Sequence, residues 1–208
     1  LLLIAFVIHG AASAQGVAAS PPDARVPATV ACFSAETEQA EELLQELPPD
    51  AGADLWEPVL KLGAATNHAA IIHMLGRMFL EDGDFAGAAP WFERGVRLGD
   101  YQAMQDLGVM WLKGEGRDVD LARAYAYFRL EAETIPRSDD YYVPRPDLVR
   151  ILKMPDVLKA RLSAQQIEDG ERLFTALKDS MTCRWNEWYW THAARAADRI
   201  RQRKRPTN

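Results

Sequence analysis

The stretch LGVMWLKGEGRDVDLARAYAYF, residues 107–128, decides the fold because it holds two apolar runs on either side of a Gly-x-Gly turn. Apolar side chains recur at spacings of three and four in both runs, which is typical of one face of an α-helix. A Gly-x-Gly can also cradle a phosphate, but a phosphate loop follows a β-strand and opens a helix. Here a helix runs into the glycines, so we expect Gly114 and Gly116 to provide positive φ angles where the chain reverses.

A related pattern lies directly upstream, in residues 67–99. Leu75-Gly76 aligns with Leu107-Gly108 at an offset of 32 residues, and Trp91-Phe92 aligns with Tyr127-Phe128 at an offset of 36 residues. The two offsets differ because the second turn is longer. Self-similarity at such a period is typical of repeat architectures, in which each unit is one helical hairpin.

The second unit resembles a Sel1-like repeat, a relative of the tetratricopeptide repeat. The family pattern has an alanine, Leu-Gly, an aromatic residue, Gly-x-Gly, an acid, Lys-Ala and an aromatic pair. In this chain Arg123 replaces the lysine, Arg117 stands where valine is usual, and Tyr127-Phe128 replace Trp-Tyr. The first unit is more degenerate, and its short turn is closer to a tetratricopeptide unit. The positions expected to shape the repeats are Leu75, Gly76, Leu107, Gly108, Trp111, Gly114, Gly116, Ala124, Tyr127 and Phe128.

The sequence therefore predicts an all-α fold, a short right-handed α-solenoid of antiparallel helical hairpins with capping helices at both ends. No sustained alternation of apolar and polar residues indicates a strand. Because one hairpin cannot bury both of its faces, neighbouring hairpins must stack. We expect the helical repeat region at 34–134, with the best repeats at 67–99 and 100–134. Residues 135–208 are expected to form a Pro-rich loop, a short helix at 147–153, C-terminal capping helices and a basic tail.

The N-terminal residues LLLIAFVIHGAASAQG resemble the apolar core and cleavage site of a secretory signal peptide. We interpret residues 1–14 as the remnant of that signal, because the charged leading segment and the initiator Met are missing, and residues 15–33 as an extended leader. The apolar run is too short to span a bilayer, which needs about 20 residues. Export to the periplasm follows from this interpretation, and a buried N-terminal helix is the alternative.

Export bears on the two cysteines, because an oxidising compartment favours a disulfide. Cys32 and Cys183 are the predicted pair, with two buried free thiols as the alternative. The histidines lack the spacing of a metal-ligand pair on a helix, so neither a metal site nor a cofactor is expected.

Charge is distributed unevenly along the chain, whose net charge is −6. Residues 36–61 carry eight acids and one lysine, whereas residues 195–208 carry six basic residues and one aspartate. The basic segment Arg195–Arg205 could contact an anionic surface or an acidic partner, or it could be a solvated helix end. Nucleic acid is not an expected partner of an exported protein. The aromatic group at Trp185–Trp190 is expected to be the packed face of a capping helix, or else a ligand platform.

The repeat pattern favours a non-enzymatic exported protein that binds a protein or peptide in the cell envelope, since stacked hairpins form an extended concave surface. By the resemblance, the first helix of each hairpin lines that surface. Two alternatives stay open: an envelope hydrolase using Glu93, Glu131 and His73, or an adaptor that binds an anionic surface through its basic tail. The oligomeric state is left open. The candidate partner-binding residues, which could equally form a solvated face, are His73, Arg77, Glu81, Gln102, Gln105 and Lys113.

Overall fold

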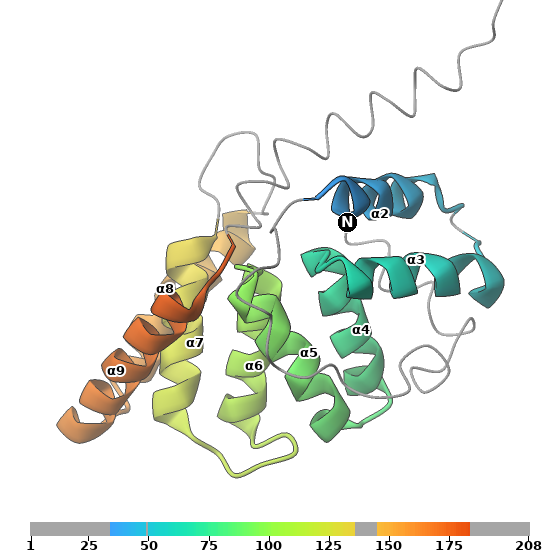
Figure 1. Ribbon diagram of the computed structural model, residues 1–208. Helices are drawn as coiled ribbons and strands as arrows, with labels where there is room; N and C mark the ends of the chain where they lie inside the picture. The colour runs from blue at the N-terminus through green and yellow to red at the C-terminus, as the bar shows by residue number, and fades with distance from the viewer. Residues whose placement is uncertain (1–33, 49, 136–144, 184–208) are drawn as a thin grey trace, which may run out of the picture.

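The computed structural model describes residues 34–48, 50–135 and 145–183, and within these ranges every regular element is an α-helix (Figure 1). The all-α expectation is thereby confirmed. The predicted signal remnant and leader, Cys32, the aromatic group at Trp185–Trp190 and the basic segment Arg195–Arg205 lie outside the described residues. The helices are α2 (Ala35–Glu46), α3 (Ala53–Ala65), α4 (Ala69–Glu81), α5 (Phe85–Arg97), α6 (Tyr101–Lys113), α7 (Leu121–Thr134), α8 (Arg145–Lys159) and α9 (Ala164–Ser180).

Two antiparallel hairpins, α4–α5 and α6–α7, stand side by side and form the centre of the molecule (Figure 1). Each of their four helices begins at a residue whose side chain accepts a hydrogen bond from a backbone N–H of the first turn, which satisfies a donor that the helix itself leaves unpaired. Helix α6 ends at Gly114, which has φ 74°, and Gly116 in the following turn has φ 70°. The four capping residues are His68, Asp84, Asp100 and Asp120.

Each hairpin is closed by an aromatic ring that lies on a glycine. A Cβ atom added to Gly76 would come within 2.5 Å of the Phe92 ring, and one added to Gly108 would come within 3.1 Å of the Phe128 ring. Both phenylalanines are buried, so the rings have little room to move away. The Leu-Gly and aromatic-pair positions of the repeat thus meet within a hairpin, the glycine making room for the second ring of the pair.

The core runs continuously through both hairpins, with Leu75 and Leu107 exposed by 1% and 0%. Trp111 departs from the apolar stripe that the helical spacing predicts, because its side chain is only partly buried. Two guanidinium groups lie against its ring: the Cζ atoms of Arg117 and Arg123 are 4.2 and 4.7 Å from the ring centre. The ring is therefore held by cation–π contacts as well as by packing.

At the N-terminal end, buried polar contacts attach α2 and α3 to the first hairpin. His68 Nε2 lies 2.8 Å from Glu41 Oε2, and His68 Nδ1 accepts a hydrogen bond from the Ile71 N–H. On the other helix of the hairpin, Arg94 donates to Asn67 Oδ1 at 2.6 Å and to the Ala64 carbonyl at 2.6 Å.

At the C-terminal end, α8 and α9 pack on α7. The prediction of a short helix at 147–153 is wrong in length, because α8 begins at Arg145 and continues through Pro155 to Lys159. Helix α9 follows the N-cap Ser163, which forms the capping box that its sequence predicts. Beyond α9 the chain reaches the first hairpin, where the Thr182 N–H donates to the Arg97 carbonyl at 2.8 Å. Within the described ranges, no helix is long and apolar enough to cross a membrane.

Candidate functional site

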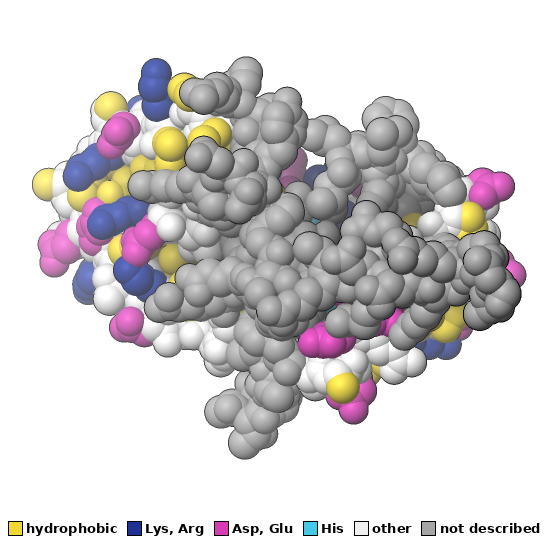
Figure 2. Space-filling view, turned by 90° about the horizontal axis from the view of Figure 1, so that it is seen from above, with side chains coloured by type: hydrophobic (Ala, Val, Ile, Leu, Met, Phe, Trp, Pro, Cys, Tyr) yellow, Lys and Arg dark blue, Asp and Glu magenta, His cyan; other side chains and the backbone are white. Residues whose placement is uncertain are grey.

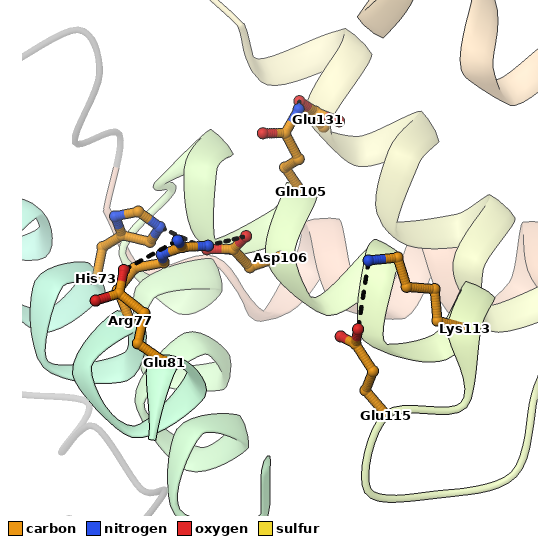
Figure 3. A network of polar contacts seen from close by, with 8 residues as sticks. All are labelled: His73, Arg77, Glu81, Gln105, Asp106, Lys113, Glu115 and Glu131. Carbon is orange, nitrogen blue, oxygen red and sulfur yellow. Dashed lines mark hydrogen bonds and ion pairs between the residues drawn. The ribbon is translucent and has the colours of Figure 1, made fainter. Parts of the chain in front are cut away.

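The candidate partner-binding residues lie on the two first helices of the central hairpins, which we call the first-helix row. His73, Arg77 and Glu81 follow one another at four-residue intervals along α4, so they share one face of that helix. Gln102, Gln105 and Lys113 belong to α6. Figure 3 shows that His73 and Arg77 on α4 both contact Asp106 on α6.

Asp106 joins the two halves of the row. Its Oδ2 atom lies 2.8 Å from His73 Nε2, and its Oδ1 atom lies 3.5 Å from Arg77 Nη1 (Figure 3). Arg77 also donates to Glu81 at 3.1 Å along its own helix. Sequence reasoning missed Asp106, although one signal was present: in the alignment of the two units it stands where the first unit has Met74. A charged residue in place of an apolar one indicates a role that the repeat itself does not require.

Burial and charge act in opposite directions on the pKa of His73. Burial lowers the pKa, but the hydrogen bond to Asp106 and the negative charges of Asp100 and Asp106 raise it above its usual value. The histidine side chain keeps 14% of its surface exposed, and that of Asp106 keeps 15%. His73 and Asp106 therefore form a largely buried hydrogen-bonded pair that links α4 to α6.

Glu131 extends the network from α6 to α7. Gln105 Nε2 donates to Glu131 Oε1 at 3.0 Å, while Glu131 Oε2 has no hydrogen-bond partner in the described part of the chain. The glutamate is 0% exposed, and burial raises its pKa from 4.5 to about 8, helped by the charge of Asp106 and opposed by that of Arg150. At neutral pH the protonated, uncharged acid is therefore the favoured form.

Three members of the first-helix row present their polar ends to solvent. The side chain of Lys113 is 62% exposed and lies 3.3 Å from Glu115, and the side chain of Arg77 is 40% exposed. Gln102 is also exposed, in the first turn of α6. The row thus combines side chains held by neighbours, His73 and Gln105, with side chains whose donors and acceptors can reach another molecule.

The residues of the hydrolase alternative are only partly brought together. His73 and Glu131 both contact α6, through Asp106 and Gln105 respectively. Glu93 belongs to α5, and its negative charge adds to burial in raising the pKa of Tyr127 to about 12. Among the residues that the structure describes, no group of three or more His, Cys, Asp or Glu side chains is arranged to hold a metal ion.

Of the two cysteines predicted to pair, only Cys183 lies within the described residues. Cys183 is 5% exposed, and its sulfur lies 3.6 Å from Thr182 Oγ1. Because Cys32 lies outside the described residues, the pairing of Cys32 with Cys183 stays a prediction.

Comparison with known proteins identifies the fold. No protein-family model matches the chain, and no curated protein matches it significantly in sequence. Among solved structures, the chain is similar to c5321, a protective antigen present in uropathogenic Escherichia coli strains that displays an SLR, or Sel1-like repeat, fold. The TM-score is 0.51 and the sequence identity 17%, over 88% of this chain and 34% of that one, so the chain spans about a third of that protein.

Proposed function

We propose that this chain, whose fold is that of a Sel1-like repeat protein, is a non-enzymatic scaffold that binds a protein or peptide along the first-helix row. One observation carries the proposal: the row is held in place by a contact between the two hairpins, His73 with Asp106, and by one within the second hairpin, Gln105 with Glu131, yet part of it is exposed. Side chains that are already fixed lose less conformational entropy when a partner binds. Asp106 and Glu131 position their neighbours, while Arg77, Gln102 and Lys113 offer the contacts.

The chemistry of the exposed part suits polar recognition. Arg77 and Lys113 supply donors, and Gln102 supplies both a donor and an acceptor. Glu81 lies beside Arg77 and Glu115 lies beside Lys113, so each carboxylate partly neutralises the positive charge next to it. A partner with both carboxylate and amide groups, such as an extended or helical peptide, matches this alternation better than a uniformly charged polymer does.

The cell envelope is the compartment we propose for this binding. The apolar run and small-residue site at residues 1–14 support export. A hydrolase of the envelope finds less support. Its best candidate acid, Glu131, is 0% exposed and hydrogen-bonded by Gln105, so a substrate has no direct access to it.

The experiment is capture of partners from a periplasmic extract on the immobilised full-length protein. The double variant Arg77→Glu/Lys113→Glu reverses two exposed charges of the first-helix row. Its matched control, Lys153→Glu/Lys159→Glu, makes the same charge change on exposed positions of α8. Helical circular dichroism of all three proteins verifies that the fold is retained.

We expect the row variant to recover at least about tenfold less of the partner than the wild type, as a loss of about 1.4 kcal/mol implies. The control should recover the wild-type amount. Equal recovery by both variants would remove the first-helix row as the binding surface.

A further inference from the structure

Helix α8 packs on α7 with one face and leaves the opposite face to solvent. Ile151 and Leu158, on the packed face, are 4% and 1% exposed. Val149, Leu152 and Val157 lie on the opposite face and are between 37% and 54% exposed. They are three of the five large hydrophobic side chains that are exposed in the described part of the chain. Exposed apolar surface is therefore concentrated on this helix, and we call the face that carries these three residues the outer face of α8.

Such a face is unexpected at this place in the fold. The capping units of helical-repeat proteins carry a polar outer face, because no neighbouring hairpin covers it. Helices α8 and α9 cap the second hairpin, yet the outer face of α8 carries aliphatic side chains. Apolar side chains that gather on an exposed face indicate a surface that contacts another body.

Basic residues surround the aliphatic ones. Residues 145–161 contain five basic residues and two acids, although the net charge of the whole chain is −6. The two acids are Asp147, which lies 3.9 Å from Arg150, and Asp156. Four of the basic residues are exposed: Arg150, Lys153, Lys159 and Arg161. Seen from above, hydrophobic and basic side chains lie close together, among acidic ones, on the α8–α9 side of the molecule (Figure 2). The outer face of α8 is thus both apolar and positively charged.

Helical spacing places the two kinds of side chain in the same strip. Val149, Lys153 and Val157 follow one another at four-residue intervals, so they share one side of α8. Leu152 and Lys159 are seven residues apart, which is about two helical turns, and they form a second row beside the first. The two rows together rise by about 15 Å along the helix. A body that covers the aliphatic side chains therefore also contacts the basic ones.

The composition of the outer face favours an anionic lipid surface over a protein. The cores of protein–protein interfaces are enriched in aromatic residues, methionine and arginine, and they are depleted in lysine. The outer face of α8 has no aromatic residue, and Lys153 stands in the middle of it. A second copy docked through the same face would bring like charges together. At a bilayer, aliphatic side chains enter the boundary of the acyl chains, while lysines reach the anionic headgroups.

We propose that α8 docks on an anionic lipid surface, with its axis along the surface and its outer face buried at the boundary between headgroups and acyl chains. Val149, Leu152 and Val157 enter the apolar layer, and Lys153 and Lys159 contact the headgroups. This docking site is separate from the first-helix row and goes beyond the proposed function. Because exposed charges draw the helix to the lipid, binding weakens as the salt concentration rises.

Sedimentation with vesicles tests the proposal on the full-length protein. The protein is mixed with vesicles of phosphatidylcholine, either alone or with phosphatidylglycerol, and its partition constant is measured. We expect at least about tenfold tighter binding to the vesicles that contain phosphatidylglycerol, because each basic residue at an anionic surface strengthens binding about fivefold. At about 1 M salt, where the Debye length is only about 3 Å, most of this difference should disappear.

Two charge variants locate the contact on the molecule. Lys153→Glu/Lys159→Glu should bind the anionic vesicles at least about tenfold more weakly than the wild type does. Its matched control, Arg77→Glu/Lys113→Glu, makes the same charge change on the first-helix row and should bind as the wild type does. The comparison separates a contact made by α8 from a general effect of net charge.

A third variant tests the apolar part of the contact. Val149→Ser/Leu152→Ser/Val157→Ser keeps every charge of the chain and should bind the anionic vesicles several-fold more weakly, because the aliphatic side chains no longer enter the bilayer. Helical circular dichroism verifies that each of the three variants is folded.

Any of three results would overturn the docking of α8 on lipid. The first is equal binding of the wild type to both kinds of vesicle, whether or not the protein then binds polyglutamate, a model of an acidic protein partner. The second is wild-type affinity of either α8 variant, which would assign lipid binding to another part of the chain. The third is equal weakening by both charge variants. Partner capture is measured without vesicles and depends on the first-helix row, so the two proposals can fail independently.

Discussion

At the scale of single residues, the repeat depends on where glycine makes room for a ring. Both Gly76 and Gly108 lie under the second ring of an aromatic pair, but the two contacts differ in closeness. A Cβ at position 76 would meet two Phe92 ring atoms at 2.5 and 2.7 Å, whereas a Cβ at position 108 would meet Phe128 at 3.1 Å. The first distance requires the buried ring to shift, and the second requires only a small adjustment.

We therefore expect Gly76→Ala and Gly108→Ala to change the free energy of unfolding by different amounts or in opposite directions. Each substitution gains about 1 kcal/mol of helix propensity, because alanine restricts the unfolded chain and favours the helix. Overpacking a core costs about 1–3 kcal/mol, and only Gly76→Ala should incur most of it. Urea denaturation should show Gly76→Ala to be less stable than Gly108→Ala by at least about 1 kcal/mol. Equal stabilities, or the reverse order, would contradict the packing described.

The periodicity of the sequence predicts which residues are buried but not which polar groups meet. Leu75, Leu107 and Phe128 follow from spacings of three and four, because a helix repeats every 3.6 residues and one face must be covered. The contacts of Asp106 with His73 and of Gln105 with Glu131 join residues about 30 positions apart. They depend on the register between helices, about which local spacing says nothing.

At the scale of helices, tertiary packing explains why α8 is longer than its sequence predicts. Proline lacks the N–H that a helix interior needs, so Pro155 indicates the end of a helix near residue 153. The helix continues because Leu158, one turn further on, is 1% exposed and packs in a cluster with Phe128 and Tyr125. Burial of a leucine is worth about 1.5–3 kcal/mol, which helps to offset the lost hydrogen bond.

The contact between α6 and α7 should also give the stability of the protein a pH dependence. The folded-state pKa of Glu131 is about 8, above its ordinary value of 4.5, because burial disfavours the charged form. The folded protein therefore retains a proton that the unfolded chain releases. The associated stability is fully present below about pH 4.5 and is lost progressively as the pH rises to about 8.

We predict that Glu131→Gln removes this part of the pH dependence, because glutamine keeps the acceptor for Gln105 and cannot ionise. The difference in unfolding free energy between pH 5 and pH 8 should shrink by an amount on the order of a few kcal/mol, since each pKa unit corresponds to about 1.4 kcal/mol. Denaturation curves across that range measure it, with Glu133→Gln, an exposed position on the same helix, as the control. If the unfolding free energies of the wild type and Glu131→Gln changed in parallel with pH, Glu131 would not be buried as described.

At the scale of the whole molecule, the fold class and the stacking of hairpins could be predicted from one well-formed repeat. The reason is physical: a hairpin with two apolar faces is stable only between neighbours. The first-helix row was predicted as a set of polar positions on two helices. The contact of Asp106 with His73 depends on how one hairpin packs on the next, and the contact of Gln105 with Glu131 depends on how α6 packs on α7.

The central claim is that a partner binds the molecule along α4 and α6, and amide hydrogen exchange of the captured complex tests it most directly. Comparison of the free and bound protein should show slower exchange in the peptides covering residues 69–81 and 101–113. The peptides of α5 and α7, at 85–97 and 121–134, should change much less. Protection confined to α5 and α7, with α4 and α6 exchanging as in the free protein, would contradict the account.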